Sequence, residues 1–238
     1  TGIFIGNESI PATHTTPESL ELAGIFAKMR EQECEYVIME VSSHALIQHR
    51  ADCIDFSAAM FTNLTRDHLD FHKTMDEYAA AKRILFEKLS PESIAIVNGD
   101  DEYHKFIWQT SSAARKLTVG RSACDYKISN ENLKIDKSEY SFEFDSQKEQ
   151  LSTKLIGRFN IDNTAICAAM AIELGLDKQV VFEAISETDG APGRMQRIPL
   201  SNVAAGIVDY AHTPDALEKA LKSCRDVING AENNNSRL

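Results

Sequence analysis

Three groups of residues in the first part of the chain carry side chains that could act together on a metal or a phosphate. Glu40 ends an apolar run over residues 36–39, residues 66–72 hold two carboxylates and two imidazoles, and Lys82 follows. Carboxylate oxygens and imidazole nitrogens are common metal ligands, and open α/β sheets bind ligands at the carboxyl ends of strands. The pattern indicates a site around Glu40 and His68, although a solvated strand end and a solvated turn explain either segment taken alone.

Lys82 falls on the apolar face of a helix that the sequence predicts over residues 76–89, in line with Tyr78 and Phe86. Burying a charged ammonium is costly, and burial lowers the pKa of a lysine until a neutral, nucleophilic amine is populated. Such an amine can take up CO₂ and become a carbamate, which would bind a metal as a carboxylate does. The alternative is a lysine whose stem packs on the helix while its ammonium reaches water.

Other polar residues lie where strands or helices are expected to begin or end. Ser42 and Arg50 follow Glu40 and could hold a phosphorylated, carboxylated ligand. Ser43 stands beside His44, but the G-x-S-x-G elbow of serine hydrolases is absent from the sequence. Five further candidates at element ends could face one crevice between two domains, namely Asn160, Asn163, Arg194, Asp209 and His212.

The spacing of apolar residues predicts an α/β fold. Short apolar runs with polar tips predict buried parallel strands over residues 36–39, 58–61, 93–97 and 116–119. Helical start signals and periodicity predict helices over residues 16–32, 76–89, 160–174 and 177–187. Alternating apolar and polar residues indicate a small antiparallel sheet between Asp125 and Arg158. Helices that alternate with strands are typical of crossover units in a mainly parallel sheet.

A second domain is expected to begin just after the glycine-rich segment 190–193. Beyond it the sequence predicts a strand over 203–208 and a helix over 215–228, which cannot bury a core by themselves. We therefore expect a three-layer α/β domain over residues 1–192, with a mainly parallel sheet and a small antiparallel sheet. The truncated start of a second α/β domain would occupy residues 193–238.

Composition narrows the class of protein. The 238 residues are 43% hydrophobic, enough for a sizeable core, and no apolar run reaches the ~18 residues that a membrane span needs. A formal net charge of −11 argues against a nucleic-acid partner. The five cysteines stand singly without C-x-x-C spacing, which argues against a disulfide framework and a zinc site. We expect a monomeric cytoplasmic protein without membrane insertion.

Eight sequence blocks, in this order and approximate spacing, resemble the Mur ligase family. They are TTP at 15–17, EVSSH at 40–44, QHR at 48–50, TNLTRDHLD at 62–70, AK at 81–82, NIDN at 160–163, GRM at 193–195 and DYAHTP at 209–214. They are most similar to the family members that add the third amino acid, meso-diaminopimelate or L-lysine, to UDP-MurNAc-L-Ala-D-Glu. Together the blocks are far more specific than any single one.

The resemblance implies an ATP-dependent acid–amino-acid ligase of peptidoglycan synthesis. It assigns Mg²⁺ binding to Glu40, His68 and a carbamylated Lys82, and catalysis to Lys82, His68 and Arg194. It places around ATP the residues Asn160, Asn163, Arg194, Asp209 and His212. It places around the UDP-sugar dipeptide the residues Thr15, Thr16, Ser42, Gln48 and Arg50. In the mechanism that it implies, the D-Glu carboxylate attacks the γ-phosphate of ATP, and the incoming amine displaces phosphate from the acyl phosphate.

One motif of the family is missing, because no G-x-x-x-x-G-K-[ST] phosphate-binding loop occurs in the sequence. We therefore expect that the complete protein is a ligase, whereas the 238-residue chain binds ATP weakly and turns nothing over. Two alternatives stay open. One is a folylpolyglutamate synthase, which shares the general plan, and the other is a non-catalytic binding module that binds no metal and keeps Lys82 unmodified.

Overall fold

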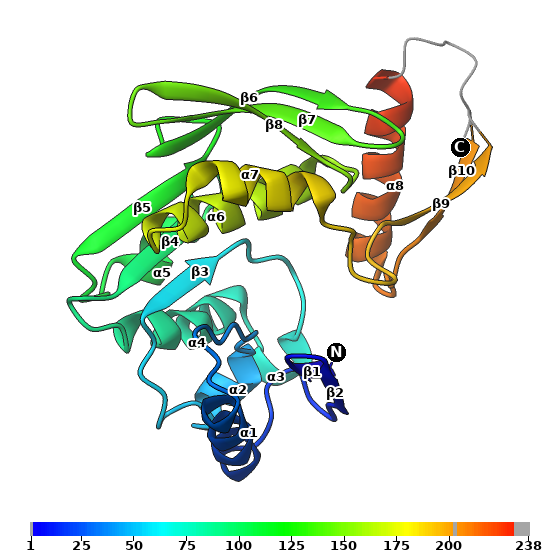
Figure 1. Cartoon of the computed structure of the whole chain (residues 1–238). Coiled ribbons are helices and arrows are strands. Elements are labelled where there is room, and N and C mark those ends of the chain that lie inside the picture. The colour runs from blue at the N-terminus through cyan, green and yellow to red at the C-terminus, as the bar shows by residue number, and fades with distance from the viewer. Residues whose placement is uncertain (1, 202–203, 231–238) are drawn as a thin grey trace. The chain divides into compact units, whose positions relative to one another are not determined.

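The computed structural model describes residues 2–201 and 204–230, in two compact units (Figure 1). Unit 1 comprises the residues up to Ala59 together with Thr65–Ala95 and Lys105–Arg115. Unit 2 comprises Met60–Leu64, Ile96–His104 and the residues from Lys116 onward. Each unit holds one group of the residues that the sequence marks as candidates for chemistry.

Unit 1 is mainly helical. Its hairpin pairs β1 (Gly2–Ile5) with β2 (Glu8–Pro11), and its helices are α1 (Ser19–Glu31), α2 (Ser43–Ile47), α3 (Leu69–His72), α4 (Met75–Glu87) and most of α5 (His104–Trp108). The helices predicted over 16–32 and 76–89 are confirmed as α1 and α4. Helix α4 begins one residue earlier than predicted, because Thr74 is its N-cap and its hydroxyl accepts the N–H of Glu77 at 3.1 Å.

The strand predicted over residues 36–39 is wrong. The segment has no regular secondary structure, and Tyr36, Val37 and Ile38 are 60%, 46% and 88% exposed. A strand exists only where a neighbour supplies ladder hydrogen bonds, and none of the strands in the described residues pairs with this segment. The apolar run predicts burial, which the exposed side chains do not show, and it carries no information about which strand would lie beside it.

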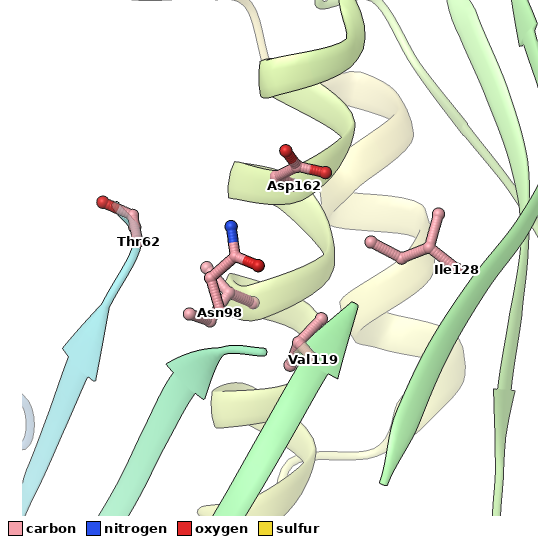
Figure 2. A pocket seen from close by; sticks show the side chains of 6 residues that line it. Thr62, Asn98, Val119, Ile128 and Asp162 are labelled. Atoms are coloured by element: carbon pink, nitrogen blue, oxygen red, sulfur yellow. The ribbon is translucent and has the colours of Figure 1, made fainter. Parts of the chain in front are cut away.

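One sheet of six strands runs in the order β3-β4-β5-β6-β7-β8. The strands are β3 (Ala58–Phe61), β4 (Ile94–Asn98), β5 (Arg115–Gly120), β6 (Tyr126–Leu133), β7 (Ser138–Phe144) and β8 (Gln147–Thr153). Figure 2 shows β3, β4 and β5 ending in the same direction, and β6 pairs parallel with β5. Strands β6, β7 and β8 are antiparallel. The predicted parallel and antiparallel parts are therefore both confirmed, and they form one continuous sheet.

Helices α6 (Arg158–Glu173) and α7 (Lys178–Glu187) pack on the antiparallel part of this sheet within unit 2 (Figure 1). The core between them is aromatic, since Phe142 is fully buried and its ring lies 5.4 Å from Tyr126 and 5.5 Å from Phe144. Tyr140 is buried as well, and its hydroxyl shares a 3.1 Å hydrogen bond with Thr164 of α6. The period-2 pattern of this segment thus places its aromatic side chains against α6.

The last described elements are an antiparallel hairpin of β9 (Gln196–Ser201) and β10 (Ala204–Val208), followed by α8 (Pro214–Gly230). The predicted strand over 203–208 and helix over 215–228 correspond to β10 and α8, with residue 203 outside the described residues. The predicted domain boundary between residues 192 and 193 stays a prediction. None of the described helices is long and apolar enough to cross a membrane.

The turn between β6 and β7 carries an ion-pair group with a clear pH dependence. Hydrogen bonds from Lys134 and Lys137 lower the pKa of Glu139 from 4.5 to about 2. Because the folded carboxyl has the lower pKa, its stabilising contribution is complete well above pH 4.5 and is lost as the pH falls toward 2. We expect Glu139→Gln to cost up to about 1 kcal/mol of unfolding free energy at neutral pH, as exposed pairs do.

Urea denaturation of the parent and of Glu139→Gln at pH 7, 5 and 3, at about 0.1 M salt, measures this contribution. The difference between the two proteins should shrink below pH 4.5 and should also shrink in about 1 M salt, which screens exposed charges. A difference that is the same at every pH would show that the ion pairs contribute nothing.

Candidate functional site

Lys82 is the most unusual charged residue of unit 1. It lies on α4, and its Nζ stands 5.1 Å from the ring centroid of Tyr78, one helical turn before it. Burial lowers the pKa of Lys82 below its ordinary value, and the Glu40 carboxylate opposes that shift. The structure places Lys82 half-buried on the helix face that the sequence marks as apolar, and its carbamylation stays a prediction. A lysine in this setting has more neutral, nucleophilic amine than an exposed one.

His68 lies beside the same aromatic ring. It stands at the start of α3 with a left-handed backbone (φ 55°), a conformation uncommon outside glycine, and its ring lies edge-on to Tyr78 at 5.7 Å. Its side chain is 46% exposed, so its imidazole can reach a ligand. The unusual backbone turns the chain between Asp67 and α3, and it brings His68 and Lys82 to one side chain, that of Tyr78.

Glu40 reaches this group from a third segment. Its side chain is exposed, and its charge acts on Lys82. Its backbone carbonyl accepts the Thr16 hydroxyl at 2.8 Å, while the same hydroxyl accepts the Ser42 N–H at 2.9 Å. Glu40 therefore acts on Lys82 from a third segment of unit 1, and the metal-binding roles of Glu40, His68 and Lys82 stay predictions.

The donor set of this site fits one kind of metal. No group of three or more His, Cys, Asp or Glu side chains that could hold a metal exists among the described residues. Two protein donors are too few for structural zinc, which takes four protein ligands. Mg²⁺ differs, because it keeps several waters and binds one or two carboxylates together with substrate phosphates. Glu40 and a carbamate on Lys82 would supply such carboxylates, and His68 would add a nitrogen donor.

A cluster of aromatic and imidazole rings packs against the residues of this site. Sequence reasoning did not predict these contacts. His72 is buried and stacks on Tyr78 with ring centroids 5.0 Å apart, and its Nε2 lies 2.8 Å from the Ser43 hydroxyl. Burial is the main cause that lowers the pKa of both His44 and His72. The signal for Tyr78 was its i, i+4 spacing to Lys82, which we interpreted only as a mark of the apolar face.

The residues predicted to hold the UDP-sugar dipeptide also lie in unit 1. Three of them have internal partners. Thr16 is buried, Ser42 caps α2 by accepting the Ala45 N–H at 3.1 Å, and Arg50 pairs with Glu18 at 2.9 Å. Arg50 also donates to the Thr16 carbonyl at 3.0 Å, so these three residues are brought together. Two others have exposed side chains, Thr15 and Gln48.

Thr16 connects the start of α1 with the Glu40 segment through two hydrogen bonds of its hydroxyl. The contribution of these bonds to stability can be measured. Thr16→Val keeps the shape but removes the hydroxyl, which leaves the Glu40 carbonyl and the Ser42 N–H without their partner. We expect a loss of about 1–3 kcal/mol in unfolding free energy, the usual cost of buried groups left unsatisfied. Thr16→Ser should lose much less. Equal losses for the two variants in urea denaturation would rule out the hydrogen bonds as the cause.

The residues predicted to surround ATP lie in unit 2, in two groups. Asn160 is buried and donates to the Ile156 carbonyl at 2.9 Å, and Asn163 donates to Asn160 at 3.5 Å. These amides link the first turn of α6 to the Ile156 carbonyl and to each other, while the N-cap of the helix, Gly157, has no side-chain cap. At 3.5 Å the second contact is weak, so the Asn163 side chain is the more available of the two.

The second group forms around the turn after β10. Asp209 accepts the N–H groups of Met195 and Ala211, each at 2.8 Å, and the Arg194 guanidinium lies 5.7 Å from the Tyr210 ring. His212 Nδ1 contacts the Tyr210 carbonyl at 2.9 Å. Arg194, Asp209 and His212 are therefore brought together, as their two motifs suggest. No contact between this group and the α6 amides is among the interactions found in the described residues.

A small pocket opens at the carboxyl ends of the parallel strands in unit 2, with polar atoms from Thr62, Asn98 and Asp162 (Figure 2). Asp162 pairs at 2.7 Å with Arg121, which also binds Asp100 at 3.1 Å. Burial raises the pKa of Asp162, and Arg121 opposes this shift. Sequence reasoning missed this pair. Asp162 lies inside the NIDN block, but nothing in the sequence connects it with Arg121.

Comparison with known proteins agrees with this arrangement. Residues 1–171 match the Mur ligase middle domain. The chain is 39% identical over 216 residues to the UDP-N-acetylmuramoyl-L-alanyl-D-glutamate--2,6-diaminopimelate ligase of Syntrophomonas wolfei, which covers 90% of this chain and 44% of that relative. A solved structure of a ligase with the same name superposes with a TM-score of 0.78 at 31% identity, over 92% of this chain and 46% of that one.

A more distant structure shares the fold alone. The MurF ligase of Thermotoga maritima in complex with ADP has a TM-score of 0.63 at 17% identity, and it covers 74% of this chain and 41% of that one. The present chain spans less than half the length of the Syntrophomonas relative. From the family match over most of its residues, together with the identity to a full-length relative, the chain belongs to the Mur ligase family.

Proposed function

We propose that the protein carrying this sequence is an ATP-dependent ligase that adds the third amino acid to UDP-MurNAc-L-Ala-D-Glu in peptidoglycan synthesis. The observation that carries the proposal is that His68 and a half-buried Lys82 both contact the ring of Tyr78, while the charge of Glu40 acts on Lys82. The names of the relatives favour 2,6-diaminopimelate over L-lysine as that amino acid. The ligase reaction would take place in the cytoplasm. The protein would act as a monomer.

The residues of unit 1 suit the activation of a carboxylate. Glu40, His68 and the carbamate of Lys82 would hold Mg²⁺, which supplies charge neutralisation for phosphoryl transfer when it is bound. The half-buried position of Lys82 favours the carbamate, because a neutral amine is the form that combines with CO₂. Exposed Thr15 and Gln48, near Arg50, would orient the dipeptide so that its D-Glu carboxylate meets the γ-phosphate of ATP.

The residues of unit 2 suit the nucleotide. Asn163 would bind the base, and Arg194 would neutralise charge on the phosphoryl oxygens as the acyl phosphate forms and as the amine then displaces phosphate from it. Asp209 holds the turn that carries Arg194 in place through its bond to the Met195 N–H, and His212 completes that turn. The ADP complex of the Thermotoga ligase supports ATP as the donor at the level of the fold.

The test is phosphate release and amide formation by the protein carrying this sequence, with ATP, Mg²⁺ and UDP-MurNAc-L-Ala-D-Glu. We expect both products with meso-diaminopimelate and much less with L-lysine. Phosphate release that responds to a folate instead would establish the folylpolyglutamate synthase alternative. Absence of any ATP-dependent product, with no metal bound and Lys82 unmodified, would establish the binding-module alternative.

A further inference from the structure

Three of the contacts that His72 makes each reach a different segment of the candidate metal site. Its backbone N–H donates to the His68 carbonyl at 2.9 Å within α3. Its Nε2 lies 2.8 Å from the hydroxyl of Ser43, three residues after Glu40 in the chain. Its ring stacks on Tyr78 at 5.0 Å, one helical turn before Lys82 on α4. His68 also contacts both neighbouring segments, because its ring lies 5.1 Å from that of His44 in α2 and 5.7 Å from that of Tyr78 in α4.

We propose that His72 is a positioning residue that holds the segments of Glu40, His68 and Lys82 in register, through Ser43 and Tyr78. This inference rests on the proposed function, since it concerns the same metal site. His72 would not touch the metal. Its imidazole is buried, and the Nε2 atom is already paired with Ser43.

The local backbone shows why such a tie is needed. Helix α3 has only four residues, and non-glycine residues with positive φ stand at both ends, His68 at 55° and Lys73 at 59°. A helix this short does not form by itself, and left-handed residues persist only where surrounding contacts hold them. His72 supplies such contacts at the end of α3, in addition to the ring contacts that His68 makes with His44 and Tyr78 at its start.

Burial makes the hydrogen bond to Ser43 specific. Both side chains are almost completely buried, at 4% and 2% exposed. A buried imidazole without a partner is costly, so the pair selects the one arrangement of α2 and α3 in which both polar groups are satisfied. An apolar residue of similar size at position 72 would fill the space without that selection.

The experiment compares His72→Leu, His72→Gln and Ser43→Ala with the parent chain, and uses His14→Leu as the control at an exposed histidine of unit 1. Mn²⁺, a spectroscopic probe for Mg²⁺, is titrated and followed by electron paramagnetic resonance. We expect His72→Leu to weaken Mn²⁺ binding by about tenfold or more, as loss of supporting contacts does at metal sites. His72→Gln, whose amide can still reach Ser43, should stay close to the parent.

Non-additivity separates positioning from general damage. If His72 acts through Ser43, the double variant His72→Leu, Ser43→Ala should bind Mn²⁺ no more weakly than His72→Leu alone. Hydrogen exchange followed by mass spectrometry should show faster exchange at residues 43–47 and 68–72 in His72→Leu, with residues 19–31 of α1 unchanged. If His72→Leu does not fold, His72→Gln and Ser43→Ala decide by the same two measurements.

Each outcome has one meaning. Parent-like Mn²⁺ affinity and exchange in His72→Leu would overturn the positioning role while the proposed function stands. A parent chain that binds no Mn²⁺ would count against the proposed metal site. In that case exchange alone decides, because faster exchange at residues 43–47 and 68–72 supports the positioning role and unchanged exchange overturns it.

Discussion

Lys82→Met should abolish carbamate formation by this chain and should lower ligase turnover of the protein by about a thousandfold or more. Methionine keeps the length and the apolar packing of the side chain but cannot combine with CO₂. Loss of a metal ligand that neutralises charge in phosphoryl transfer removes several kcal/mol of transition-state stabilisation, and about 4 kcal/mol corresponds to that factor. The carbamate is measured by ¹³C NMR after addition of labelled bicarbonate, which reports on Lys82 independently of turnover.

Lys88→Met is the matched control for this prediction. Lys88 is the C-cap residue of the same helix and is partly exposed. It forms an ion pair with Asp52 at 2.8 Å, which favours its charged ammonium over the neutral amine that combines with CO₂. The variant should keep the carbamate signal of the parent. The prediction is wrong if the carbamate signal persists in Lys82→Met, or if the parent shows no signal at saturating bicarbonate. Lys82 would then be an unmodified lysine whose aliphatic stem packs on the helix.

Phe142→Ala should cause the largest loss of stability, about 3–5 kcal/mol of unfolding free energy. Phe142 is completely buried, and its ring contacts the rings of Tyr126 and Phe144. Truncation removes these aromatic contacts and leaves a cavity between β7 and the helices that cover it. The total free energy of unfolding of a small domain is about 5–15 kcal/mol. The loss should therefore appear as a large decrease in the urea concentration at the midpoint of unfolding.

Phe159→Ala separates this cavity effect from simple loss of apolar surface. Phe159 lies on α6 of the same unit but is 38% exposed, so its removal should cost less than about 1 kcal/mol. Similar losses for the two variants would mean that the aromatic core of unit 2 is not well packed. A normal near-UV spectrum in Phe142→Ala would point to the same conclusion.

Much of the local structure was predictable because its causes lie close together in the sequence. The helix predicted over residues 76–89 and its apolar face lie within a few turns of Lys82, and α4 confirms both. The alternation of aromatic residues around Phe142 likewise predicted strand β7 and its buried face. Such patterns depend on backbone periodicity, which acts over a few residues.

Pairings between distant residues were not predictable in the same way. The bond from Thr16 to the Glu40 carbonyl spans 24 residues, and the contact of His72 with Ser43 spans 29. Thr16 and Ser42 were expected to face a ligand, and the structure shows that internal hydrogen bonds also use their hydroxyls. Their roles in substrate binding, like those of all the site residues, stay predictions.

By itself the sequence determined that this is an α/β protein of the Mur ligase family, and it singled out Lys82 as a lysine on an apolar helix face. Only the tertiary structure decided that Tyr78 stands between Lys82 and His68, that His72 ties their segments to α2, and that residues 36–39 form no strand among the described residues. The reason is physical. Periodicity and capping are local properties of the chain, whereas ring contacts, buried hydrogen bonds and strand pairs exist only where folding closes long loops.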